Sequence, residues 1–327
     1  MEYKGKKILV TGGAGFIGSH MVDNLMAYGA NVVVLDNLSV GKRKNIKKWL
    51  HNPNFSLIVG DLLKIKEIEK AVNHCELVFH LAANPEVRLG VENPRIHFEQ
   101  NIVATYNLLE AMRKSKEAKT IVFTSSSAVY GDATSLPTTE NYGPLIPISL
   151  YGASKLAGES LIYSYCHTFD MRATVYRFAN IVGPRSRHGV IYDFVQKLRA
   201  NPRELEILGD GTQTKSFLLI DDCVEGLLFG LEHLRDRFEL FNIGSEDRIS
   251  VKDVAEIVLK EFGLSEVKLR FTGGVDGGRG WKGDVKHSFL AINKIKSLGW
   301  NPKHNSTESV RLATRMIKAE LESKSNK

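Results

Sequence analysis

A tyrosine and a lysine stand four residues apart, at Tyr151 and Lys155. On a helix, this spacing places the phenol and the ammonium group on one face. A free tyrosine has a pKa near 10, so a phenol that acts as a base at neutral pH needs roughly 4 kcal/mol of preferential phenolate stabilisation. A nearby ammonium has the right charge to contribute to it. The pair therefore predicts proton transfer with a hydroxyl or carbonyl group, although the same spacing also occurs on ordinary helix surfaces.

Three serines, Ser125, Ser126 and Ser127, follow an apolar run that predicts a strand at residues 120–125. Open parallel sheets bind their ligands at the carboxyl ends of the strands. A serine there can hydrogen-bond a reacting alcohol or carbonyl, or it can satisfy the turn that ends the strand. Together with Tyr151 and Lys155, the serines favour a catalytic site.

A glycine turn joins the first predicted strand, residues 7–11, to the first predicted helix. Gly12 permits the tight bend, Gly15 lets the backbone approach a pyrophosphate, and Gly18 allows close helix packing. The helix amides and dipole then face the anion. Asp36 ends the next strand, where a carboxylate accepts hydrogen bonds from ribose hydroxyls and repels a 2′-phosphate. The turn and the acid together predict a dinucleotide site that favours NAD over NADP.

Two further residues follow the same geometry. Asn37, not an arginine, comes directly after Asp36, although Lys42 and Arg43 lie nearby in the sequence. Asp61, followed by Leu62, ends the third predicted strand and would lie near the adenine, but a lone acid there could equally cap a turn or helix.

The elements that must position these residues alternate along the first two thirds of the chain. Dense apolar runs are typical of strands covered on both faces, and they alternate with segments of helical period. We therefore expect an α/β fold, a Rossmann-type doubly wound parallel sheet with a smaller mixed α/β substrate-binding domain. The expected strands are 7–11, 30–36, 55–60, 77–82, 120–125, 172–178 and 240–243, and the expected helices in the first part are 16–28, 65–73, 94–114 and 150–168.

The pattern loosens beyond residue 180. Helices are expected at 192–200, 221–233 and 306–323, and a capping box at Ser250 and Asp253 predicts another through residue 262. Residues 273–283 predict a glycine-rich loop. We expect an NAD-binding domain over 1–178, with 216–244 returning to it, a substrate-binding domain over 179–215 and 245–323, and a polar tail at 324–327.

Length and composition exclude several classes of protein. The chain has 327 residues, 44 basic and 37 acidic side chains, and 43% hydrophobic residues, which is enough for a sizeable core. No apolar run is as long as a membrane span, and the start of the chain does not resemble a signal peptide, so we expect a cytoplasmic protein without a membrane partner.

Three scattered cysteines predict reduced, mostly buried thiols. The charge of +7 is spread along the chain and indicates an anion-binding cleft, with no nucleic-acid partner. The histidines show no metal-ligand spacing, so no metal site is expected.

Taken together, these motifs resemble the extended short-chain dehydrogenase/reductases over nearly the whole chain, and within them the nucleotide-sugar 4-epimerases of the UDP-glucose type. The residues that carry the resemblance include the glycine turn, Asp36, His80-Leu81-Ala82-Ala83, Asn101, the serines, and Tyr151 with Lys155. The resemblance implies bound NAD, a catalytic hydroxyl at Ser126, a base at Tyr151 and a helper at Lys155. It also implies a homodimer built on a four-helix contact. The cofactor-binding set that we expect is Gly12, Gly15, Phe16, Ile17, Gly18, Asp36, Asn37, Asp61, Leu62, Leu81, Ala82, Ala83, Asn101, Tyr151 and Lys155.

The resemblance also implies residues that bind the substrate. Asn180 would lie beside the substrate diphosphate, Lys215 stands where many relatives have arginine, and Arg279 matches a second phosphate-binding arginine. A lysine neutralises phosphate but lacks the bidentate fork of arginine. Arg88 could contact either a sugar hydroxyl or a carboxylate. The substrate-binding set that we expect is Arg88, Ser126, Ser127, Tyr151, Asn180, Lys215 and Arg279.

The implied reaction is NAD-dependent 4-epimerisation of UDP-glucose and UDP-galactose through a transient 4-keto sugar. Related dehydratases and decarboxylases need an acid beside the catalytic hydroxyl, where this chain has Ser127 and Ala128. Ketosugar reductases of the superfamily usually take NADPH, which Asp36 disfavours. A UDP-glucuronate/UDP-galacturonate 4-epimerase is the close alternative, because Arg88 could contact a carboxylate and Arg185 and Arg187 add two cations near the same region. A non-catalytic NAD-sensing protein is the second alternative, but it would not need Ser126, Tyr151 and Lys155 together.

Overall fold

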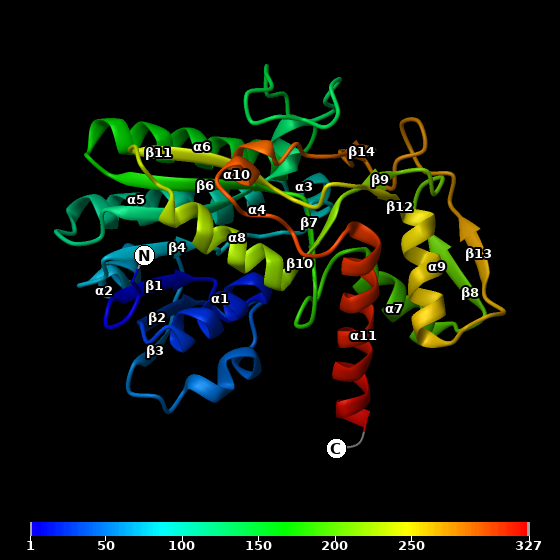
Figure 1. Ribbon diagram of the computed structural model, residues 1–327, viewed down its shortest axis with the longest axis horizontal. Helices are drawn as coiled ribbons and strands as arrows, with labels where there is room; N and C mark the ends of the chain where they lie inside the picture. Colours follow the sequence, from blue (N-terminus) through cyan, green and yellow to red (C-terminus); the bar gives the residue numbers. More distant parts are fainter. Residues whose placement is uncertain (1, 326–327) are drawn as a thin grey trace.

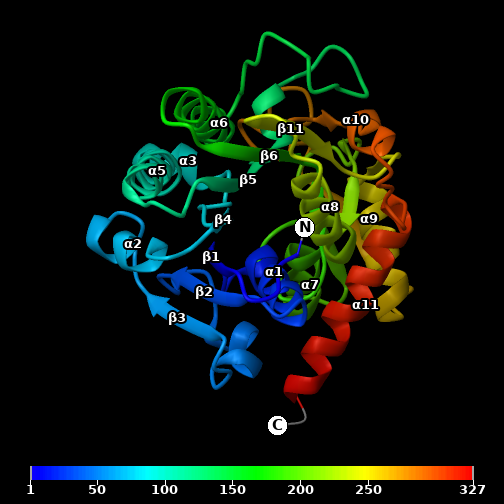
Figure 2. The ribbon, with the colours of Figure 1, turned by 60° about the vertical axis from the view of Figure 1, so that its left-hand side comes forward.

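The computed structural model describes residues 2–325 and contains one large parallel sheet covered by helices on both faces (Figures 1 and 2). The seven strands lie in the order β11-β6-β5-β4-β1-β2-β3, all parallel, which confirms the Rossmann-type fold. Their bounds are β1 (Lys7–Thr11), β2 (Asn31–Asp36), β3 (Phe55–Val59), β4 (Leu77–His80), β5 (Thr120–Ser126), β6 (Arg172–Phe178) and β11 (Phe238–Ile243).

The strands have continuous apolar sequences because both of their faces are buried. Ile8 and Val10 of β1 pack into one hydrophobic cluster, whereas Leu9 between them packs into another on the opposite face. Helices α1 (Phe16–Ala27) and α8 (Ile220–Glu232) cover the first face. Helices α2 (Ile65–Val72), α5 (Ala104–Lys114) and α6 (Leu150–Thr168) cover the second, as Figure 2 shows.

The helix expected at 94–114 is divided into three parts. It begins as α4 (Pro94–His97), widens to a π-helical segment η2 (Phe98–Val103) and continues as α5. The Thr105 hydroxyl of α5 donates a hydrogen bond to the Asn101 carbonyl of η2 at 2.6 Å. Such π-helical turns are frequent at functional sites. The expected helical bounds are confirmed, and the π-helical segment within them carries Asn101.

The later segments form a second group of elements with its own core. Strands β7 (Asn180–Val182) and β10 (Phe217–Leu219) pair, as do β8 (Glu204–Ile207) and β13 (Lys268–Phe271). A small sheet joins β12 (Ile249–Ser250), β9 (Thr214–Lys215) and β14 (His287–Ser288). Helices α7 (Val190–Ala200), α9 (Val251–Phe262) and α11 (Ser306–Ser325) enclose a common cluster around Phe194, Val254 and Val310. Residues 238–243 cross back to the large sheet as β11, and α8 packs against α1.

Local signals in this part had mixed outcomes. The capping box of Ser250 and Asp253 is confirmed at the start of α9. Helix α11 runs to Ser325, two residues beyond its expected end at 323, so residues 324 and 325 of the expected tail are helical and residues 326–327 lie outside the described part. The domain boundaries stay a prediction. The remaining short helices are η1 (Arg43–Trp49), α3 (Leu89–Glu92), η3 (Ser127–Tyr130) and α10 (Asn293–Ser297).

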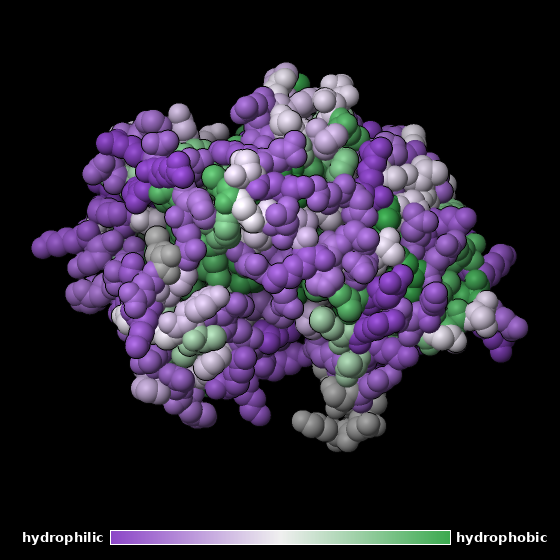
Figure 3. Space-filling view, viewed as in Figure 1, coloured by the Kyte–Doolittle hydropathy of each residue, from purple (hydrophilic) through white to green (hydrophobic). Residues whose placement is uncertain are grey.

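The visible surface is mainly hydrophilic, with apolar side chains in small separated patches (Figure 3). Within residues 2–325, no helix combines the length and the apolar character needed to cross a membrane. The same part of the chain contains no cluster of histidine, cysteine or acidic side chains that could hold a metal ion. Cys75, Cys166 and Cys223 are free and buried, as predicted.

Candidate active site

The glycine turn lies at the carboxyl end of β1, where its conformation depends on missing side chains. Gly12 has a φ of +68°, and a Cβ there would lie 2.8 Å from the backbone of Ala82. A Cβ on Gly18 would lie 2.1 Å from the Gly12 carbonyl oxygen, and one on Gly15 would lie 3.0 Å from it. Helix α1 begins at Phe16, directly after the turn. The amide groups of its first turn therefore open onto a backbone cradle that a pyrophosphate can enter.

Asp36 sits beside this cradle with its side chain held by the backbone. Its carboxylate accepts hydrogen bonds from the amides of Ala14 at 2.9 Å and Leu38 at 2.8 Å. Burial raises the pKa of Asp36, and these two bonds act in the opposite direction. Asn37 donates a hydrogen bond to Asp61 at 3.0 Å, which links the ends of β2 and β3. Asp36, Asn37, Asp61 and Leu62 all line the same cavity, together with Gly12, Gly15, Phe16, Ile17 and Gly18.

The loop after β4 forms the next part of the wall. Leu81, Ala82 and Ala83 line the cavity, but Asn101 does not. Asn101 is buried, accepts a hydrogen bond from the Asn84 amide at 2.8 Å and donates one to the Ser154 hydroxyl at 2.9 Å. Its side chain therefore ties the cavity loop to α6, and its contact with the cofactor stays a prediction.

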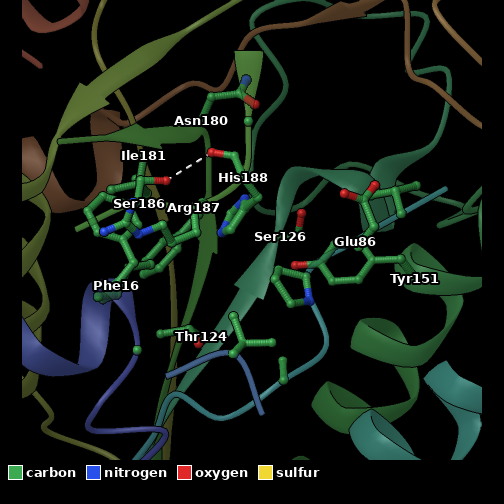
Figure 4. Close-up of a pocket in the computed structure, with 18 of the residues that line it drawn as sticks. Phe16, Glu86, Thr124, Ser126, Tyr151, Asn180, Ile181, Ser186, Arg187 and His188 are labelled. Atoms are coloured by element: carbon green, nitrogen blue, oxygen red, sulfur yellow. Dashed lines mark hydrogen bonds between the residues drawn. The ribbon is translucent and has the colours of Figure 1, made fainter. Parts of the chain in front are cut away.

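The catalytic candidates meet at the middle of this cavity. Ser126 ends β5 and caps η3, accepting a hydrogen bond from the Ala128 amide at 3.2 Å. Tyr151 lies in the first turn of α6, which Ser149 caps. Figure 4 shows the Ser126 and Tyr151 hydroxyl oxygens near each other, and the two side chains interact. Ser126, Ser127, Tyr151 and Lys155 all line the cavity. The structure thus brings together the hydroxyl, phenol and ammonium that the sequence predicts.

The ionisation of the pair differs from the simple expectation. Burial raises the pKa of Tyr151 to about 12, although its hydrogen bond with Ser126 acts in the opposite direction. Burial lowers the pKa of Lys155 to about 8, against the attraction of Glu159. The Lys155 ammonium donates to the Thr124 carbonyl at 2.8 Å and lies 5.9 Å from the centre of the Tyr151 ring. Without a bound ligand, the protein therefore favours the protonated form of Tyr151. Further positive charge near the phenol is needed for Tyr151 to act as a base.

A buried ion pair joins α6, the helix that carries Tyr151 and Lys155, to strand β6. Arg177 of β6 contacts both carboxylate oxygens of Glu159 in α6, with the shortest distance 2.7 Å, and the two side chains are 5% and 7% exposed. Ser125 also donates to Glu159. Sequence reasoning missed this pair. The available signal concerned Glu159 alone: it stands four residues after Lys155, so the two side chains lie on one face of the helix.

His97 is a second residue that sequence reasoning missed. It is buried beneath the cavity, and its ring packs edge-on against Tyr151 with 5.7 Å between ring centres. Burial lowers its pKa, so the ring is neutral. No local motif pointed to His97, because its contact with α6 depends on how α4 packs in the folded chain.

The expected substrate residues divide into two groups. Arg88, Asn180 and Lys215 line the cavity, but Arg279 does not. The Arg279 guanidinium forms a two-pronged ion pair with Asp132 at 2.9 Å and donates to the Asp284 carbonyl at 2.6 Å. Lys215 pairs with Asp284 at 3.0 Å. The structure therefore holds Arg279 outside the cavity lining, and its expected role in phosphate binding stays a prediction.

This arrangement defines a class of protein. A parallel sheet whose strand ends carry a glycine cradle, a ribose-binding acid and a Ser-Tyr-Lys set in one cavity is that of the extended short-chain dehydrogenase/reductases. Comparison with known sequences agrees. The chain belongs to the NAD dependent epimerase/dehydratase family, whose sequence profile matches residues 8–244.

Several relatives are similar over almost the whole chain. A putative UDP-glucose 4-epimerase of Methanocaldococcus jannaschii is 35% identical over 95% of this chain and 98% of its own length. A crystal structure of a UDP-galactose 4-epimerase is 44% identical, with a TM-score of 0.85 over 96% of this chain and 99% of that one. A UDP-glucuronic acid 4-epimerase from Bacillus cereus, solved with UDP-glucuronic acid and NAD, is 31% identical with a TM-score of 0.86 and the same coverage.

NAD is the cofactor of this family, and the cavity of this chain fits it. The turn at Gly12, Gly15 and Gly18 can keep its shape only because Cβ atoms are missing, since added Cβ atoms would meet the Ala82 backbone or the Gly12 carbonyl oxygen. Asp36 keeps carboxylate lone pairs available for a ribose while the backbone holds it in place. A fixed carboxylate at this point disfavours a 2′-phosphate.

Proposed function

We propose that this protein is an isomerase that interconverts UDP-glucose and UDP-galactose by inverting C4, using tightly bound NAD. The observation that carries the proposal is the placement of the Ser126 and Tyr151 hydroxyls near each other in the cavity that the glycine turn also lines. A sugar hydroxyl held between these two oxygens would lie where an adjacent nicotinamide can reach its carbon.

Each member of the set has a separate task in this proposal. NAD, when bound, supplies a reversible hydride acceptor and a positive ring. Tyr151 takes the proton of the sugar 4-hydroxyl, and Ser126 hydrogen-bonds the same oxygen and orients it. Lys155, held on the Thr124 carbonyl, contributes positive charge beside the phenol. Because Tyr151 starts from a pKa of about 12, both positive charges are needed to make it a base near neutral pH.

Inversion also requires that the 4-keto sugar turn within the site and present its other face. The nucleotide must remain anchored during this movement. We assign that task to Lys215 and Asn180, which line the cavity away from Tyr151. The lysine supplies a point charge to the diphosphate, and the amide supplies a hydrogen-bond donor.

A UDP-glucuronate/UDP-galacturonate 4-epimerase is the second candidate. The similarity to the Bacillus cereus UDP-glucuronic acid 4-epimerase favours it, and the two reactions share the same chemistry at C4. A non-catalytic NAD-sensing protein is the third possibility, against which the complete Ser-Tyr-Lys set argues.

The test is to purify the protein, determine bound NAD after denaturation, and incubate it separately with UDP-glucose and UDP-glucuronate. Chromatography should reveal UDP-galactose from the first substrate without added coenzyme. Conversion of UDP-glucuronate alone would replace the first proposal by the second. Bound NAD with no 4-epimer from either substrate would reject both and favour the sensing protein.

We also infer a cytoplasmic homodimer that contacts through α5 and α6. Large apolar side chains are exposed on these helices and the neighbouring η2, including Tyr106, Leu150, Tyr163 and Phe98. Covering such side chains is a common basis for subunit association. Light scattering during size-exclusion chromatography tests the inference, and a monomeric mass would contradict it.

A further inference from the structure

An ion pair within the cavity bears on which sugar the site accepts. Glu86 and Arg88 follow β4, and both line the cavity. The Arg88 guanidinium donates to the two carboxylate oxygens of Glu86, at 2.9 and 3.2 Å, and the Arg88 amide donates to the same carboxylate at 3.3 Å. The Glu86 amide in turn donates to the Asn84 side chain at 3.1 Å. The carboxylate of Glu86 is thus held in place. Its partner is Arg88, the arginine for which the sequence allowed either a sugar hydroxyl or a carboxylate as a partner.

Glu86 lies at the reacting end of the cavity. Figure 4 shows it on the same side as Tyr151 and Ser126, across from Arg187 and His188. His97 packs against the Tyr151 ring and also interacts with the charge of Glu86. Hydrogen bonds and charge from Arg88 keep the pKa of Glu86 below its usual range, although burial opposes them. The Glu86 carboxylate therefore lines the reacting end of the cavity as half of an ion pair, and it keeps the Arg88 guanidinium occupied.

The cavity offers little positive charge to offset a second carboxylate. Five lysine or arginine side chains line it in the described part of the chain: Arg88, Lys155, Arg185, Arg187 and Lys215. Four of them have carboxylate partners, which are Glu86, Asp23, Glu320 and Asp284 respectively for Arg88, Arg185, Arg187 and Lys215. The fifth, Lys155, is hydrogen-bonded beneath Tyr151.

We propose that Glu86, fixed by Arg88, is a specificity-determining residue that selects nucleotide sugars uncharged at C6 and disfavours uronates. The inference rests on the proposed 4-epimerisation. A uronate carboxylate sits two bonds from C4, so it must approach Glu86 whenever C4 approaches Tyr151. Like charges at short distance repel strongly when water is partly excluded, and such repulsion is a common source of specificity.

Turning of the 4-keto sugar strengthens this selection. When the ring presents its opposite face, its C6 substituent moves across the cavity from one wall toward the other. A hydroxymethyl group passes Glu86 as a hydrogen-bond partner, whereas a carboxylate passes it as a like charge. A uronate therefore meets the repulsion on binding or on turning, and each route lowers its kcat/KM relative to the neutral sugar.

The test compares UDP-glucose with UDP-glucuronate in the wild-type protein and in Glu86→Gln. Wild-type kcat/KM should be at least about tenfold higher for UDP-glucose. The Gln side chain removes the negative charge and releases Arg88, so Glu86→Gln should reduce this preference by roughly tenfold, mainly by improving UDP-glucuronate. The matched control is Glu204→Gln, because the Glu204–Arg270 pair has the same exposure, 34% and 47% against 33% and 48% for Glu86–Arg88, and lies outside the cavity lining.

An unchanged preference in Glu86→Gln, or the same change in Glu204→Gln, would overturn the inference. If Glu86→Gln does not fold, kcat/KM of the wild-type protein for both nucleotides decides: a value for UDP-glucuronate equal to that for UDP-glucose rejects the role of Glu86. These outcomes differ from failure of the proposed function, in which the NAD-loaded wild-type protein converts neither nucleotide. Efficient wild-type turnover of UDP-glucuronate would leave 4-epimerisation in place and reject only the selection by Glu86.

Discussion

The two ends of the cavity are built by different means. At the cofactor end, backbone atoms form much of the contact surface, and glycines at positions 12, 15 and 18 let the turn pack closely against its neighbours. At the substrate end, charged side chains contribute to the wall, and each of Arg88, Arg187 and Lys215 is held by an acid. A backbone cradle is determined by neighbours in the sequence, whereas a side-chain pair depends on where distant segments meet. The backbone cradle therefore recognises its ligand rigidly, whereas a single substitution can change the specificity of a side-chain pair.

Tyr151, where the two ends meet, should show the largest effect. We expect Tyr151→Phe to lower kcat by about 10³-fold or more, because it removes the hydroxyl that exchanges the proton. NAD content should be unchanged, because the phenyl ring preserves the cavity wall. The measurements are turnover of UDP-glucose and NAD released on denaturation. Unchanged turnover would remove Tyr151 from the mechanism.

Glu159→Gln tests the support beneath the site. The substitution leaves the Arg177 guanidinium, 5% exposed, without its anion. Breaking one side of a buried pair costs about 3–5 kcal/mol, and urea denaturation should show this loss. The control is Glu99→Gln, whose partner Arg95 is 79% exposed and whose loss should cost at most about 1 kcal/mol. Equal losses in both variants would mean that the buried pair adds nothing to stability.

Gly18→Ala tests the backbone cradle. The new Cβ would lie 2.1 Å from the Gly12 carbonyl oxygen, so the turn must shift. We expect NAD affinity to fall by about 100-fold, or roughly 2.7 kcal/mol, measured by titration of the NAD-free protein. A comparable alanine at Gly143, where a Cβ meets nothing within 4 Å, should leave the affinity unchanged. Normal NAD binding by Gly18→Ala would show that the cradle tolerates side chains.

Arg279→Ala should have the smallest effect. Its guanidinium pairs with half-exposed Asp132 away from the cavity lining, so KM for UDP-glucose should change by less than about threefold. Lys215→Met provides the contrast: it removes a cation that lines the cavity and should raise KM by about tenfold. Similar increases in both variants would restore the phosphate-binding role that the sequence suggests for Arg279.

Sequence patterns were most informative where local geometry governs. The strands of the sheet, the turn at Gly12 and the cap at Ser250 could be predicted because each depends on residues within a few positions. The order of the strands also agrees with a doubly wound fold, because right-handed crossovers restrict the possible topologies. The helix at 94–114 was also predicted, but not the π-helical segment at Phe98–Val103 within it.

The sequence by itself determined the fold class, the NAD turn and the Ser-Tyr-Lys set, because each is encoded in short segments of fixed spacing. Only the tertiary structure decided how the charges are paired. Arg279 is bound by Asp132, which lies 147 residues away, and Arg177 is bound by Glu159 through contact between a strand and a helix. Burial, which raises the pKa of Tyr151 and lowers that of Lys155, is likewise a property of the folded chain. Electrostatic interactions depend on distance and local dielectric, and neither quantity can be read from the order of residues.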